Sequence, residues 1–256
     1  MKNQKLMLAS ALLCALLTNF AHADDAVAPA AAKPDNELAY NIGVVTDYRY
    51  RGISQTNMDP ALQGGADYTN NPTGFYAGTW LSTIKWTKDI SGTGDVEWDL
   101  YAGKRGDIAP DLSYDVGVLS YVYPSNGLAQ VMNYVNANTT EVYGQLSYKV
   151  VSLKYSQSVT NLFGNPNSKN SGYLDLSSTI DLTEGYSLGL HVGHQSVKNN
   201  DAYAYTDWKV GVSKDMFGVN VGLSVVGTNA DKMLYVTPDD KFTGKTALLL
   251  NVLKTF

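Results

Sequence analysis

The sequence predicts an all-β protein, an up-and-down antiparallel transmembrane β-barrel of about twelve strands. Two observations carry this prediction. Apolar and polar residues alternate with a period of two along most of the chain, and in a strand this period places them on opposite faces. Short and long connections also alternate between the predicted strands, and a membrane barrel sorts its connections in this way between its two rims.

Composition excludes several other classes of protein. Of the 256 residues, 44% are apolar and 17% charged, with 18 tyrosines and 8 prolines, whereas disordered chains are poor in aromatic residues and rich in charge. Beyond the N-terminus no apolar run approaches the roughly 20 residues that a transmembrane helix needs. The formal charge of −5 predicts no nucleic-acid partner, because a nucleic-acid-binding protein presents a basic face.

The N-terminal residues predict export. Lys2 and Lys5 precede an apolar stretch at residues 6–17, and a small-x-small sequence ends at Ala23, as in a cleavable signal peptide. The alternative is a short N-terminal helix. We expect a signal peptide at residues 1–23, a flexible leader rich in alanine and proline at 24–37, and the barrel at 38–256. The single cysteine, Cys14, leaves with the signal, so the mature chain would contain no disulfide.

Alternation is clearest in the first predicted strand. There Tyr40, Ile42, Val44, Tyr48 and Tyr50 share one face, and the opposite face is polar and charged. The predicted strands lie at residues 39–51, 61–69, 74–84, 95–105, 111–122, 140–149, 151–158, 173–182, 186–195, 204–213, 217–226 and 245–255.

A soluble β-sandwich would show the same alternation, and three features favour the barrel instead. First, the polar face is rich in small residues, which suit a curved interior. Second, the chain ends in a strand that closes on Phe256, a feature by which the barrel-assembly machinery recognises outer-membrane proteins. Third, aromatic residues lie near the ends of the apolar faces, as in membrane-interface girdles. These residues are Tyr40, Tyr50, Tyr68, Tyr148, Tyr155, Tyr186 and Phe217. We therefore expect contact with outer-membrane lipid and a location in the bacterial outer membrane.

Three stretches near the start of the predicted barrel resemble a known family. They are residues 41–55 (NIGVVTDYRYRGISQ), 60–68 (PALQGGADY) and 74–80 (GFYAGTW), and they are similar to the opening of the TorF family of porins from Gram-negative bacteria. The resemblance implies a small outer-membrane barrel that acts as a pore. It implies no particular substrate and no set of binding residues.

The polar faces supply the candidate residues of a pore. If the apolar faces point outward, the interior receives Asp47, Arg49, Arg51, Asp95, Glu97, Asp99, Arg105, Asp115, Glu141, Asp175, Asp181, His191, Asp207 and Lys209. Acidic residues outnumber basic ones among them, which favours a mild preference for cations. The alternative is that these charges pair across the lumen and fill it.

The cluster Asp47, Arg49 and Arg51 is the candidate constriction. Its alternative role is a structural ladder of ion pairs to Asp95, Glu97 and Asp99. We expect a porin-like channel through which small polar solutes or ions diffuse. The alternative function is a closed structural or ligand-binding barrel that acts through its extracellular loops.

The sequence does not predict an enzyme. His194 and Ser196 are two residues apart on one face, which is too close for a cross-strand catalytic pair, and no nucleophile motif surrounds them. The mature chain has no cysteine and no cluster of histidines, so neither a metal nor another cofactor is expected.

Overall fold

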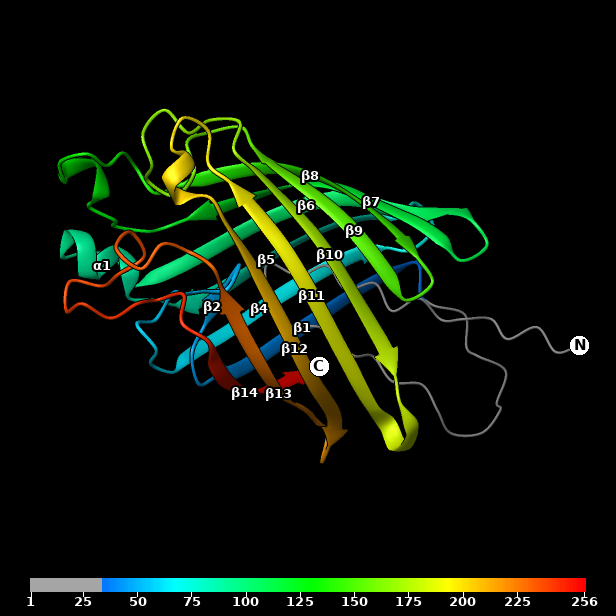
Figure 1. Cartoon of the computed structure of the whole chain (residues 1–256). Helices are drawn as coiled ribbons and strands as arrows, with labels where there is room; N and C mark the ends of the chain where they lie inside the picture. Colours follow the sequence, from blue (N-terminus) through cyan, green and yellow to red (C-terminus); the bar gives the residue numbers. More distant parts are fainter. Residues whose placement is uncertain (1–33) are drawn as a thin grey trace, which may run out of the picture.

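The computed structural model describes residues 34–256, and these residues form a closed barrel of antiparallel strands (Figure 1). The predicted signal peptide and residues 24–33 of the predicted leader lie outside the described residues. The barrel strands are β1 (Asn36–Val45), β4 (Ala61–Asn70), β5 (Phe75–Thr83), β6 (Val96–Ala109), β7 (Leu112–Val122), β8 (Thr139–Tyr148), β9 (Val151–Ser158), β10 (Gly172–Asp181), β11 (Tyr186–Ser196), β12 (Tyr205–Met216), β13 (Val219–Thr228) and β14 (Ala247–Thr255). The remaining elements are β2 (Arg49–Tyr50), β3 (Ile53–Ser54), α1 (Trp86–Ser91) and the short 3₁₀ turns η1 (Leu128–Gln130), η2 (Thr183–Gly185) and η3 (Asp201–Tyr203).

Twelve strands make up the barrel, and each pairs with its neighbours in the chain, apart from the strands that close the ring. The ring closes where β1 pairs with β14, with Val44 opposite Val252. At the end of this seam the backbone N–H of Phe256 donates to the carbonyl of Tyr40 at 2.9 Å. Closure gives every strand two hydrogen-bonded neighbours, so the barrel has no open edge. The predicted fold class is therefore confirmed.

The connections differ between the two rims, as the sequence predicts. At one rim short turns of two or four residues join the strands, for example Phe217 and Gly218, whose φ angles of 55° and 75° suit a tight hairpin. At the other rim lie long loops such as residues 123–138 and 229–246, together with α1 (Figure 1). No helix among residues 34–256 has the length and apolar character to span a membrane.

The outward face is apolar. Large apolar side chains from all twelve barrel strands are exposed, including Leu176, Val210 and Leu223 near the middle of their strands. Six of the seven predicted girdle residues are exposed: Tyr40, Tyr68, Tyr148, Tyr155, Tyr186 and Phe217. A soluble protein rarely exposes an apolar surface of this extent, whereas hydrocarbon stabilises it.

The first predicted strand, residues 39–51, is wrong in its second half. β1 ends at Val45, and the chain then turns into the barrel, where β2 and β3 form a small hairpin. Tyr48 and Tyr50, which we expected on the outer face, are only 3% and 8% exposed. The hairpin reverses at Arg51 and Gly52, whose φ angles are 46° and 79°. A Cβ atom on Gly52 would lie 2.7 Å from the Cβ of Asp207, so only glycine fits this close approach.

A lysine on the outer face tests the orientation of the strands. Leu223 lies in the middle of β13, and a midplane lysine on a lipid face costs roughly 2–4 kcal/mol, so Leu223→Lys should lower the free energy of unfolding in lipid vesicles by this amount. Val219→Lys, at the end of the same strand, is the control and should cost only about 0–1 kcal/mol. Equal losses in urea titrations would contradict the assigned outer face.

Candidate functional site

The candidate site is the barrel lumen together with the segment that folds into it, residues 46–60, here called the lumen hairpin. Arg49 holds one side of this segment. Its Nε donates to Asp47 Oδ2 at 2.5 Å, and its Nη1 donates to the carbonyl of Thr243 at 2.7 Å. The other carboxylate oxygen of Asp47 accepts from Ser54 Oγ at 2.6 Å. The buried Asp47–Arg49 pair therefore fixes the hairpin internally and ties it to the loop before β14.

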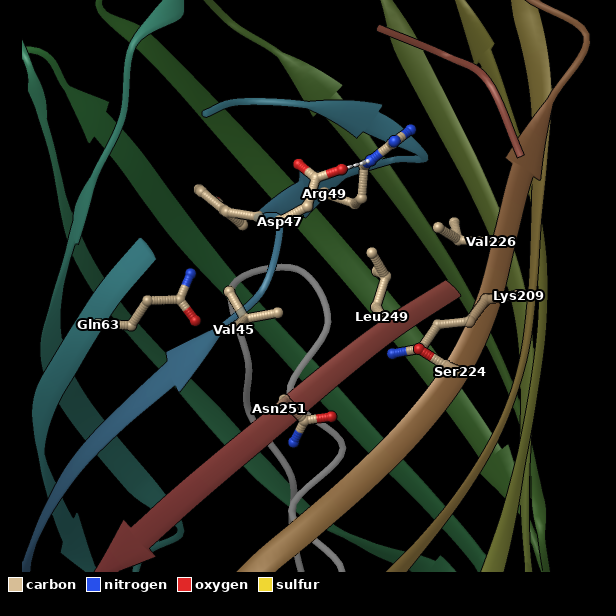
Figure 2. A pocket seen from close by; sticks show the side chains of 10 residues that line it. Val45, Asp47, Arg49, Gln63, Lys209, Ser224, Val226, Leu249 and Asn251 are labelled. Carbon is tan, nitrogen blue, oxygen red and sulfur yellow. Dashed lines mark hydrogen bonds and ion pairs between the residues drawn. The ribbon is translucent and has the colours of Figure 1, made fainter. Parts of the chain in front are cut away.

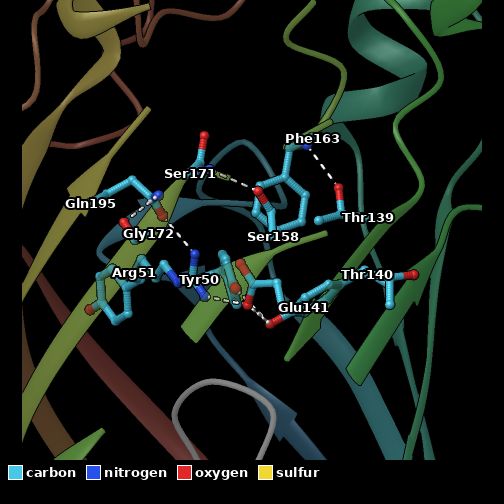
Figure 3. A network of polar contacts seen from close by, with 12 residues as sticks. Tyr50, Arg51, Thr139, Thr140, Glu141, Ser158, Phe163, Ser171, Gly172 and Gln195 are labelled. Carbon is cyan, nitrogen blue, oxygen red and sulfur yellow. Dashed lines mark hydrogen bonds and ion pairs between the residues drawn. The ribbon is translucent and has the colours of Figure 1, made fainter. Parts of the chain in front are cut away.

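Arg51 holds the other side of the hairpin (Figure 3). Its Nη2 donates to Glu141 Oε2 on β8 at 2.7 Å, and its Nη1 donates to Gln195 Oε1 on β11 at 2.6 Å. The guanidinium carbon also lies 4.1 Å from the ring centroid of Tyr173 on β10. One side chain thus connects the hairpin to three strands, and its charge is met by a carboxylate and by an aromatic face.

Aromatic side chains complete the anchoring. The hydroxyls of Tyr50 and Tyr121 are 2.6 Å apart, and both rings make edge contacts with Phe163. Tyr48 contacts the Trp80 ring at 5.5 Å between centroids and donates its hydroxyl to Glu97 Oε1 at 3.0 Å. Burial raises the pKa of Tyr48 well above its usual value, so this hydroxyl stays protonated and can donate. The hairpin therefore contacts opposite walls and narrows the lumen on the side of the long loops.

The structure places most of the predicted pore residues inside the barrel. Eight are buried, four are half-buried, and two are exposed at the rims. The buried residues are Asp47, Arg49, Arg51, Glu97, Asp99, Asp115, Glu141 and Asp207, and the half-buried ones are Arg105, Asp175, His191 and Lys209. The exposed residues are Asp95 and Asp181.

Two of these positions differ from the prediction. Asp95 precedes β6 and lies in the long loop, where it contacts the ammonium of Lys88 at 3.6 Å. Asp181 ends β10 at the rim of short turns and accepts from Ser187 Oγ at 3.1 Å. The alternation persists through both residues, but the strands end there, so neither side chain reaches the narrow part of the lumen.

The charges inside the lumen do not form the ladder considered from the sequence. Arg49 pairs with Asp47 and Arg51 with Glu141, rather than with the acidic residues of β6. A second network lies on β10, β11 and β12. There His191 contacts Asp175 through Nδ1 at 3.0 Å and Asp207 through Nε2 at 2.7 Å. Pairing of this kind lowers the cost of placing charge inside a barrel.

Inward-facing tyrosines are the feature that sequence reasoning missed. Tyr76 donates to Asp115 Oδ1 at 2.6 Å, Tyr101 donates to Asp67 Oδ1 at 2.6 Å, and Tyr173 donates to Asp207 Oδ1 at 2.9 Å. Parity does place Tyr101 on the polar face of β6, opposite to Leu100 and Ala102, but it does not reveal the hydrogen bond to Asp67. Tyrosine was expected mainly at the membrane interfaces, yet its hydroxyl also serves as the hydrogen-bond donor for buried carboxylates.

The residues considered for catalysis do not form a catalytic pair. His194 Nδ1 lies 3.0 Å from Thr206 Oγ1, while Ser196 Oγ donates to the carbonyl of Gly172 at 3.1 Å. In the described part of the chain, no three His, Cys, Asp or Glu side chains come together as candidate metal ligands.

Comparison with known proteins places the chain in a family. The family model described as "Bacterial protein of unknown function (Gcw_chp)" matches residues 29–256. The chain belongs to this family. No curated protein matches this Gcw_chp chain in sequence.

Solved structures share the fold of this Gcw_chp protein, and two of them are described here. The structure titled "KdgM porin" matches with a TM-score of 0.51 and 9% identity, over 86% of this chain and 98% of that chain. The structure titled "NanC porin structure in rhombohedral crystal form" matches with a TM-score of 0.52 and 10% identity, over the same shares of the two chains. At these identities the likeness concerns the fold alone, which is that of a porin-like barrel.

The buried pair between the hairpin and β8 can be tested by substitution. Arg51→Met leaves the Glu141 carboxylate buried without its cation, so the free energy of unfolding should fall by about 3–5 kcal/mol. Lys85→Met removes one partner of the solvent-exposed pair with Asp59 and should cost about 0–1 kcal/mol. Urea unfolding of both variants in the same lipid measures the difference. Equal effects would show that the Arg51 contact does not anchor the hairpin.

Proposed function

We propose that this protein is a porin-like channel of the bacterial outer membrane, through which small polar solutes or ions diffuse, with a mild preference for cations. The observation that carries the proposal is a closed barrel whose outer face is apolar and whose interior is lined by charged and hydroxyl side chains. A polar interior makes a path for water and solutes, and a folded-in loop that narrows this path limits their size.

The proposed location rests on several features. Exposed apolar strands and an aromatic girdle suit contact with outer-membrane lipid. A signal peptide at residues 1–23 would supply export, and the terminal strand with Phe256 would supply recognition by the barrel-assembly machinery. The resemblance of residues 41–55, 60–68 and 74–80 to the TorF family of porins points to the same location.

The proposed cation preference rests on the acidic side of the lumen. Glu97 and Asp99 lie on one face of β6, and Glu97 accepts its hydrogen bond from the neutral hydroxyl of Tyr48. Within residues 34–256 no ion pair of Glu97 with an arginine or lysine is found, whereas Asp47 and Glu141 are paired with arginines, so we assign the preference to this face of β6.

Glu97→Gln should lower the ratio of potassium to chloride permeability, because it replaces a carboxyl group that can carry negative charge by a neutral amide. The measurement is the zero-current potential across a planar bilayer in a potassium chloride gradient. Asp95→Asn is the matched control, because Asp95 lies at the exposed rim beside Lys88 and should change the ratio less. An unchanged potential in Glu97→Gln would remove this residue from the conducting path.

Shortening the lumen hairpin tests the constriction. Val45 and Ala61 are partners on adjacent strands, so replacing residues 48–55 by Gly-Gly still allows β1 and β4 to connect. Single-channel conductance should rise and larger neutral sugars should pass, because the segment that crosses the lumen is gone. Deletion of Asp239 and Asp240, at the exposed tip of the last loop, is the control and should leave conductance unchanged.

The same recordings decide between the two candidate functions. The closed barrel that acts through its extracellular loops is favoured by the anchoring of the hairpin between opposite walls of the lumen. If the full-length protein gives no conductance steps, the channel proposal is wrong and this second function takes its place. If the shortened variant conducts no better than the full-length protein, the hairpin is not the constriction.

A further inference from the structure

Beneath the lumen hairpin lies a chamber that the proposed function does not by itself explain (Figure 2). It is open to solvent and is roofed by Asp47, Tyr48 and Arg49. Its wall comes from five neighbouring strands of the closed ring, namely β12, β13, β14, β1 and β4. We call this space the lumen chamber.

Three polar side chains extend into the lumen chamber from adjacent strands. They are Lys209 on β12, Ser224 on β13 and Asn251 on β14 (Figure 2). Among residues 34–256, no hydrogen bond or ion pair is found for any of these three side chains. A half-buried ammonium without a partner is costly, and a bound anion would lower that cost.

Asp47 in the chamber lining and the two carboxylates beside His191 are engaged by groups other than Lys209. Asp47 accepts from Arg49, Ser54 and Thr56, so its charge is balanced by Arg49. On the neighbouring strand His191 is the register partner of Lys209, and it holds the carboxylates of Asp175 and Asp207. The Asp47 and Arg49 charges cancel, so Lys209 leaves the lining of the chamber with one net positive charge.

The rest of the lining indicates the chemical character of a ligand. Val45, Val226 and Leu249 form an apolar surface beside the polar groups. An inorganic ion would leave this surface without a contact, whereas a short carbon chain would cover it. Gln63 also lines the chamber, but its amide nitrogen donates to Ser82 Oγ at 3.2 Å. The combination of the Lys209 ammonium, the polar groups of Ser224 and Asn251, and an apolar surface suits a small molecule with one carboxylate and a short aliphatic chain.

We propose that the lumen chamber binds a small aliphatic monocarboxylate. Lys209 is the counter-ion of the carboxylate, Ser224 and the Asn251 amide donate hydrogen bonds to it, and the carbon chain lies against Val45, Val226 and Leu249. This inference deepens the proposed function, because it names a class of solute for the channel. It is compatible with a cation preference, because β6, which carries Glu97, and β12, which carries Lys209, lie six strands apart in both directions around the ring.

The test is a binding measurement on the full-length protein in detergent micelles, with sodium butyrate as the probe and butanamide as its uncharged counterpart. Saturation-transfer NMR should detect butyrate and not butanamide. Lys209→Gln should raise the dissociation constant of butyrate at least about tenfold, because it removes a charge-assisted contact. Lys154→Gln is the matched control, since Lys154 is an inward lysine of β9 that contacts Tyr143 outside the chamber, and it should bind butyrate as the parent protein does.

A second variant keeps the test decisive if Lys209→Gln fails to fold. Asn251→Ala retains the Lys209 charge and should raise the dissociation constant of butyrate about three- to tenfold, since it removes one hydrogen-bond donor. Equal binding of butyrate and butanamide, or unchanged binding in both chamber variants, would overturn the proposal.

Binding and conduction can fail separately. If butyrate binds through Lys209 but bilayers show no conductance, the proposed binding site is supported and the channel proposal is wrong. If the protein conducts but no butyrate binding is detected, the channel stands and the proposed ligand is wrong.

Discussion

The pairing of β1 with β14 is the interaction on which the rest of the structure depends. Val44 and Val252 are far apart in the chain, and their strands must meet before the ring can close. In hydrocarbon, unpaired backbone amides and carbonyls cost several kcal/mol each, so an open sheet of these strands would not be stable there. Closure therefore creates the enclosed lumen in which the lumen hairpin and its buried charges lie.

An enclosed lumen changes the cost of each charge inside it. The arginines of the lumen hairpin are nearly inaccessible to solvent, and each is met by a carboxylate, Arg49 by Asp47 and Arg51 by Glu141. Tyrosine hydroxyls satisfy carboxylates elsewhere, as Tyr48 does for Glu97. These contacts hold the hairpin across the barrel and make it part of the interior. Lys209 stands apart, because no partner for its ammonium lies within the described residues.

Much of the barrel followed from local patterns. The period of two predicted which side chains of β6 and β10 point outward, and the alternation of tight and long connections predicted the two rims. The same pattern failed at Tyr48 and Tyr50, because the alternation of apolar and polar residues continues past Val45, whereas strand β1 ends there. A left-handed turn at Arg51 and Gly52 reverses the chain there, and alternation carries no information about such a reversal. The prediction for Asp95 was wrong for a related reason, since alternation does not show where a strand begins or ends, and β6 begins only at Val96.

The sequence by itself determined the class of fold, the outer and inner faces of most strands, and the chemistry available to the lumen, because these depend on residues close together in the chain. Only the tertiary structure decided which charges meet. The contacts of Arg51 with Glu141 and Gln195 join residues 90 and 144 positions apart in the chain. The lumen chamber likewise exists only because five strands of a closed ring bring Lys209, Ser224 and Asn251 together beneath the hairpin. Such encounters depend on closure and register, which no local pattern specifies.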